Sequence, residues 1–82
     1  NSRLPIEKLR ANNADVNIQD EDSWTPLHAA CSMGYYEMAK YLLENGANVN
    51  SLTVDNERPI DLVEHDNFEL ISLLLNYINS IN

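Results

Sequence analysis

Apolar residues along the chain recur at helical spacing, in short blocks that polar loops separate. Between residues 36 and 45 they follow an i, i+1, i+4, i+5 pattern, which places them on one face of a helix. These residues are Met38, Ala39, Leu42 and Leu43. Gly46 follows closely, and a glycine there ends a helix because it accepts positive φ. The pattern predicts a helix from about Tyr36 to Asn45.

A shorter helix is predicted just before this one. Pro26 suits the first turn of a helix, where its missing N–H would have no partner inside the helix. Gly34 provides the positive φ that ends it. The residues between are small or apolar, which lets this helix pack closely on its neighbours; they include Leu27, Ala29, Ala30 and Cys31.

The chain repeats itself when it is shifted by 33 residues. Residues 13–17 then fall on residues 46–50, and residues 26–28 fall on residues 59–61. Gly34 falls on Asn67. One offset shared by separate segments indicates an internal repeat, and repeats of this length build stacked structures.

This repeat divides one domain, residues 1–82, into about two and a half units. Residues 4–20 form a partial unit with one helix near its start, equivalent to the second helix of a full unit. Residues 21–53 form a full unit, and residues 54–82 form a terminal, degenerate one. The predicted fold class is all-α, with helix pairs stacked side by side.

Two features of the last unit lead to specific expectations. Asn67 takes the place of Gly34, so we expect it to end the short helix with a positive φ, which Asn tolerates. After Phe68 the alignment continues with one residue fewer, which we interpret as a shortened turn between the last two helices.

Net charge limits the kinds of partner. The chain has 13 acidic and 5 basic residues, for a formal charge of −8. Nucleic acids and anionic membranes are therefore unsuitable partners, because both are bound through Lys and Arg. A protein with a basic surface is the natural complement.

The remaining composition favours a reducing compartment. The one cysteine, Cys31, excludes a disulfide within the chain and zinc sites built from several cysteines. No apolar stretch approaches the ~18 residues of a membrane span. We expect a cytoplasmic location, with the nucleus as the alternative, and neither cofactor nor metal.

The central unit resembles the ankyrin repeat. It carries Asp-Ser-Trp-Thr-Pro-Leu-His-Ala-Ala over residues 22–30, which contains the T-P-L-H-x-A motif typical of that family. Residues 41–50 resemble the end of the repeat, and the likeness extends from about residue 4 to residue 78. The last unit departs from the motif, since Arg58 replaces Thr and Asp61 replaces His. The resemblance implies a non-enzymatic module that binds another protein.

A narrower likeness concerns the closing units. Residues 23–43 and the Pro-Ile-Asp-Leu stretch at 59–62 resemble the last repeats of subunits that target type-1 protein phosphatase, such as the myosin-phosphatase targeting subunits. The resemblance implies a regulatory or targeting subunit of that phosphatase as an alternative function. The basic-Val-x-Phe docking motif that those subunits hold before their repeats does not occur in these residues.

Two residues suggest catalysis or metal binding but have simpler explanations. In ankyrin repeats the histidine at the position of His28 bonds to the threonine and backbone at the start of the helix. A metal would need further ligands, and His65 is distant in sequence. Cys31 lies on the packed face of a short helix, where a buried cysteine is commonly an apolar filler. A metal-binding or Cys/His enzyme remains the alternative from another class.

The resemblance places the candidate partner-binding residues on loop tips and along a concave groove. We expect contacts from Glu21, Asp22, Trp24, Ser32, Met33, Val54, Asp55, Glu57, His65 and Asp66. For the acidic loop residues the alternative is simple solvation, because their spacing is too short for a calcium loop. For Trp24 the alternative is packing between repeats, although Trp is enriched at interface hot spots.

The two ends of the chain are unusually apolar for a repeat stack. Residues 70–75 read most simply as the core face of the last helix, yet Leu73, Leu74, Tyr77 and Ile78 together leave the terminal unit apolar. Leu4, Ile6 and Leu9 make the other end apolar in the same way. Exposed apolar ends promote association, so contact between two copies and contact with more chain are both open alternatives.

Overall fold

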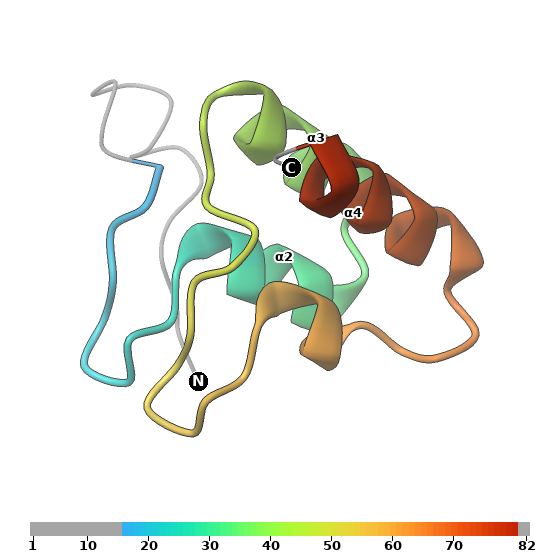
Figure 1. Cartoon of the computed structure of the whole chain (residues 1–82). Helices are drawn as coiled ribbons and strands as arrows, with labels where there is room; N and C mark the ends of the chain where they lie inside the picture. The colour runs from blue at the N-terminus through green and yellow to red at the C-terminus, as the bar shows by residue number, and fades with distance from the viewer. Residues whose placement is uncertain (1–15, 81–82) are drawn as a thin grey trace.

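The computed structural model describes residues 16–80 as a stack of helices joined by loops of different lengths (Figure 1). The elements are α2 (Pro26–Met33), α3 (Tyr36–Glu44), the 3₁₀ turn η1 (Pro59–Leu62) and α4 (Phe68–Ser80). α2 packs against both α3 and η1, and α3 packs against α4. The predicted all-α stack is confirmed for these residues. The partial unit's helix, near 4–11, lies outside the described residues.

α2 begins and ends as its sequence predicts. The Thr25 hydroxyl accepts a hydrogen bond from the His28 N–H at 3.3 Å, and the Thr25 N–H donates to His28 Nδ1 at 3.1 Å. These reciprocal bonds satisfy backbone and side-chain groups at the helix start. Gly34 has φ 73°, and the following Tyr35 N–H donates to the Ala30 carbonyl at 2.9 Å. The glycine is required here because the left-handed conformation is costly for other residues.

α3 is also confirmed, and its apolar face is buried. Ala39 and Leu42 have no exposed surface, and Leu43 is 4% exposed. Gly46 follows with φ 95°, and the Ala47 N–H donates to the Leu42 carbonyl at 2.9 Å. This closing bond satisfies a carbonyl that the end of the helix would otherwise leave unpaired.

The last unit differs from the prediction at Asn67. Its φ is not positive, and it does not end a helix. Instead its side-chain oxygen accepts a hydrogen bond from the Leu70 N–H at 3.3 Å, so Asn67 caps the start of α4. The expectation for Asn67 is wrong because the short helix has already ended at Leu62, and the residue belongs to the next element.

The turn before α4 is longer than expected, not shorter. Residues 63–67 connect η1 to α4, whereas two residues, 34 and 35, connect α2 to α3. Val63 adopts an extended conformation, with ψ 137°, and turns its side chain into the core. A continued helix would place Glu64 at the position of the fully buried Cys31, and burying an unpaired carboxylate is costly. Ending the helix early leaves Glu64 exposed.

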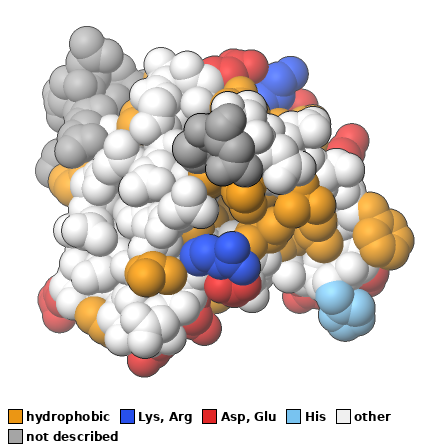
Figure 2. Space-filling model, viewed as in Figure 1, with side chains coloured by type: hydrophobic (Ala, Val, Ile, Leu, Met, Phe, Trp, Pro, Cys, Tyr) orange, Lys and Arg blue, Asp and Glu red, His pale blue; other side chains and the backbone are white. Residues whose placement is uncertain are grey.

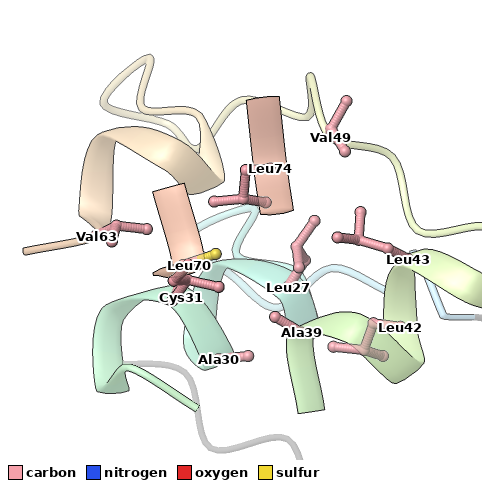
Figure 3. Close-up of a cluster of buried hydrophobic side chains, with 10 residues drawn as sticks. All are labelled: Leu27, Ala30, Cys31, Ala39, Leu42, Leu43, Val49, Val63, Leu70 and Leu74. Carbon is pink, nitrogen blue, oxygen red and sulfur yellow. The ribbon is translucent and has the colours of Figure 1, made fainter. Parts of the chain in front are cut away.

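The core lies between the helix pairs and is shared by both units (Figure 3). Its members come from α2, α3 and α4 and from the loops between the elements: Leu27, Ala30, Cys31, Ala39, Leu42, Leu43, Val49, Val63, Leu70 and Leu74. Leu70 and Leu74 are fully buried, so within residues 70–75 these two supply the core face of the last helix as expected, whereas Leu75 is 44% exposed. Leu74 therefore does not contribute to an exposed apolar end. In residues 16–80 no helix combines the length and apolarity needed to cross a bilayer.

Candidate protein-binding surface

Two loops, residues 18–24 and 51–57, extend from the stack and are called the finger loops here. The first is held by Asp20, whose Oδ1 accepts hydrogen bonds from the N–H groups of Asp22 and Trp24, both at 2.9 Å. Ser23 adopts a positive φ of 63° at its tip. These bonds form a local turn without any β-strand in residues 16–80.

The second finger loop uses a threonine for the same purpose. Thr53 is 4% exposed, and its hydroxyl accepts hydrogen bonds from the N–H groups of Asp55 at 3.1 Å and Glu57 at 3.2 Å. Asn56 has φ 64°, at the position equivalent to Ser23. Both finger loops therefore have the same tip geometry, although different side chains stabilise it.

The finger loops lie side by side and are bonded to each other (Figure 1). The Val54 N–H donates to the Asp22 carbonyl at 3.1 Å. At the base, His28 Nε2 lies 2.9 Å from the Glu57 carbonyl oxygen. His28 is fully buried, so this bond anchors the second loop to α2 and fixes its position relative to the first.

The structure brings together the candidate residues of the finger loops. Glu21, Asp22 and Asp55 are exposed, and Val54 is 61% exposed between them. Glu57 is half-buried, because its backbone is held by Thr53 and His28. The tips therefore present carboxylates around an apolar side chain on an ordered edge.

Trp24 lies at the base of the first finger loop, as the repeat register predicts. Its side chain is partly buried, and its ring centroid lies 5.9 Å from that of His28, with the planes tilted by 40°. Packing within the stack therefore accounts for part of the indole surface. The rest remains accessible beside the finger loops.

The other candidates gather at the far end of α2. Ser32 and Met33 are exposed, and Met33 is 60% exposed. They line an open pocket of about 500 Å³ together with Gly34, Glu64, Asp66 and Asn67. His65 is exposed but is not among the lining residues. The pocket and the finger loops lie at opposite ends of α2, which rises about 1.5 Å per residue.

Sequence reasoning missed some members of this surface. Glu64 and Asn67 line the pocket, and Ile18 and Leu52 expose apolar side chains on the finger loops. The alignment held one usable signal: Glu64 falls on Cys31, a position that cannot bury a carboxylate. The outward orientation of Ile18 and Leu52 depends on loop geometry that the repeat pattern does not contain.

The alternative chemistry finds little support in the geometry. Cys31 has no exposed surface, and burial raises the pKa of its thiol to about 12, which disfavours the nucleophilic thiolate. Both ring nitrogens of His28 are engaged, with Thr25 and with Glu57. Within residues 16–80, His, Cys, Asp and Glu side chains form no group of three that could hold a metal ion.

Comparison with known proteins gives a consistent result. A family model described as "Ankyrin repeats (3 copies)" matches residues 4–82. Human BCL-6 corepressor-like protein 1 is 47% identical over 70 residues, covering 84% of this chain and 4% of that protein. Human protein phosphatase 1 regulatory subunit 27 is 45% identical over 68 residues, covering 83% of this chain and 44% of that protein. The mouse form of the latter is 43% identical.

These matches confirm the resemblances on which the sequence-based prediction rests, including the likeness to a phosphatase regulatory subunit. The chain spans less than half the length of either human relative. Since the family model covers nearly the whole chain, this protein belongs to the ankyrin-repeat family and is a protein-interaction module.

Proposed function

We propose that this chain is a non-catalytic adaptor that binds a basic surface of another protein through its finger loops and the exposed end of α2. The observation that carries the proposal is the pair of bonds that fixes the loops, from Val54 to Asp22 and from His28 to Glu57. A partner meets a preorganised edge, so less conformational entropy is lost on binding.

Charge supports a basic partner. Three exposed carboxylates lie on the same loop tips as Val54, from Glu21, Asp22 and Asp55. The whole chain has a formal charge of −8, which would accelerate the approach of a positive surface. Val54 and the accessible part of Trp24 supply apolar area, and interface cores combine such area with a polar rim.

Type-1 protein phosphatase is the candidate partner we favour. The likeness to protein phosphatase 1 regulatory subunit 27 covers 83% of this chain, and that protein's name describes a regulatory subunit. In this proposal the adaptor brings the phosphatase to a target and performs no chemistry itself. The buried Cys31 and the fully engaged His28 are consistent with this role.

Binding of purified type-1 phosphatase catalytic subunit, measured by surface plasmon resonance, which gives both Kd and association rate, tests the proposal. Asp55→Lys reverses a tip charge, and Trp24→Ala removes apolar area at the loop base. We expect each variant to weaken binding by about tenfold or more, the range of a hot-spot residue. Asp55→Lys should act mainly on the association rate, because rim charges steer the encounter.

Glu44→Lys is the matched control, because it makes the same charge reversal at an exposed site on α3. Its effect should be much smaller than that of Asp55→Lys. Absence of phosphatase binding would remove this partner. Equal effects of Asp55→Lys and Glu44→Lys, on any partner, would remove the assignment to the finger loops.

A further inference from the structure

α4 has an apolar stripe that residues 16–80 cover only in part. Its members recur at i, i+3, i+7 and i+10, the spacing of a helix-pairing seam. They are Phe68, Ile71, Leu75 and Ile78. Phe68 is 74% exposed and Leu75 is 44% exposed, whereas Ile71 and Ile78 are half-buried because they also pack against the core. Figure 2 shows hydrophobic side chains gathered over α4.

The chemistry beside α4 disfavours a further ankyrin repeat as the occupant. In the central repeat His28 faces the Glu57 carbonyl of the next finger loop at 2.9 Å. The equivalent residue in the last repeat is Asp61, whose carboxylate accepts from the Arg58 N–H at 2.9 Å and from the Arg58 guanidinium at 3.4 Å. An ionised carboxylate cannot donate to a carbonyl. The last repeat therefore lacks the donor that links one repeat to the next.

The scarcity of charge along α4 makes a second copy of the chain a suitable occupant of the stripe, because repulsion between the two acidic chains is weakest there. Among the residues of α4 only Glu69 is charged, although the chain as a whole has a charge of −8. Two copies can therefore approach along α4 with little local repulsion. In an antiparallel pair with Phe68 opposite Ile78, the two Glu69 carboxylates would lie about 12 Å apart along the helix axes at ~1.5 Å per residue. That separation exceeds the Debye length of about 8 Å in physiological salt.

We propose that this protein forms a twofold homodimer in which α4 pairs antiparallel with α4 of a second copy. Phe68 would then lie near the partner subunit's Ile78, and Ile71 near the partner subunit's Leu75. Such an interface is self-complementary, as twofold symmetry requires. α4 is remote from the finger loops in Figure 1, so the dimer would present two protein-binding surfaces and could bind two partners at once.

Sedimentation velocity from micromolar to millimolar concentration tests this dimer directly. We expect a concentration-dependent dimer whose Kd rises by about tenfold or more in Leu75→Glu, because a carboxylate would be desolvated in the seam. Phe68→Glu should have a similar effect. It should preserve the fold, since an acidic residue in the first turn of a helix is favourable. Added salt should strengthen the dimer, because it screens repulsion between two acidic chains.

Val54→Glu is the matched control, since Val54 is an apolar residue of similar exposure on a finger loop. Its dimer Kd should equal that of the parent chain. Circular dichroism would establish that each variant is folded. A parent chain that stays monomeric at millimolar concentration overturns the proposal. A dimer that survives both Leu75→Glu and Phe68→Glu, or one that salt weakens, also overturns it. None of these outcomes depends on which partner the finger loops bind.

Discussion

His28 Nε2 lies 2.9 Å from the Glu57 carbonyl oxygen, so a buried imidazole joins residues 29 positions apart in the sequence. The other ring nitrogen, Nδ1, accepts the Thr25 N–H at 3.1 Å. A neutral imidazole carries one proton, and these contacts place it on Nε2, where it donates to Glu57. His28 therefore caps α2 with one nitrogen and anchors the second finger loop with the other.

Replacing His28 with Asp should separate these two roles. Asp61 demonstrates that an aspartate at this position can accept the backbone N–H at the helix start. It cannot donate to a carbonyl, so His28→Asp leaves the Glu57 carbonyl unpaired beside a buried charge. We expect the free energy of unfolding to fall by at least about 2 kcal/mol, measured by urea denaturation.

The reciprocal variant, Asp61→His, is the control for this measurement. Asp61 forms an ion pair with Arg58 at the surface. The Arg58 side chain is 46% exposed and the Asp61 side chain is 42% exposed. Such pairs contribute about 0–1 kcal/mol, so the change should stay within that range. Similar losses in the two variants would contradict the role assigned to the bond between His28 and Glu57.

The sequence predicted helix ends correctly where neighbouring residues alone determine them. Thr25, Pro26 and Gly34 specify the start and end of α2 through caps that involve neighbouring residues, and the structure agrees. The prediction that Asn67 ends a helix was wrong, because the role of this residue depends on where the preceding helix ends. That end is set by the cost of burying Glu64, a tertiary effect that periodicity does not report.

The candidate surface was only partly predictable for a related reason. Repeat register places Glu21, Val54 and Asp55 at loop tips, and the structure has them exposed there. The pocket at the end of α2 exists because η1 ends at Leu62 and residues 63–67 form a loop. A regular repeat would continue the helix there, so the lining residues Glu64 and Asn67 could not be deduced from the repeat pattern.

Asn67 provides a direct test of the corrected reading. Asn67→Ala removes the side-chain oxygen that accepts the Leu70 N–H, and loss of such a cap costs about 1 kcal/mol. Asn67→Asp should retain the stability, because a carboxylate also accepts this bond and suits a helix N-terminus. If Asn67 instead ended a helix with positive φ, Asn67→Gly would be the stabilising change. Urea denaturation of the three variants distinguishes the two geometries.

Asp61 should give the protein a small dependence of stability on acid. The Arg58 N–H, and then the Arg58 side chain, bond to the Asp61 carboxylate and lower its pKa. A lowered pKa stabilises the folded state above the unfolded pKa of about 3.9, and this contribution is lost as pH falls through the folded value. The carboxyl is largely exposed, so solvent screens the effect.

Asp61→Asn isolates this contribution, since Asn can still accept the Arg58 N–H. Between pH 6 and pH 3 the melting temperature of the parent chain should fall slightly more than that of Asp61→Asn, by a few degrees at most. Identical acid profiles for the two proteins would show that the pair does not contribute to stability.

Cys31 should make the stability of the protein fall as the pH rises into the alkaline range. Burial raises the pKa of its thiol to about 12, whereas an unfolded cysteine ionises near 8.5. Above the unfolded value the unfolded chain loses a proton that the folded chain keeps, so stability falls with rising pH. The loss approaches about 1.4 kcal/mol per pH unit until the folded value is reached.

Cys31→Ala removes this term at the cost of a small cavity in the core. At pH 7 we expect the variant to be less stable by about 1 kcal/mol, because a fully buried side chain is shortened. By about pH 10 the order should reverse, as the parent chain loses stability to thiol ionisation while the variant does not. Urea denaturation of both proteins across this range measures the difference, and other titrating groups cancel in the comparison. A constant difference from neutral to alkaline pH would mean that Cys31 is accessible to solvent in the folded state.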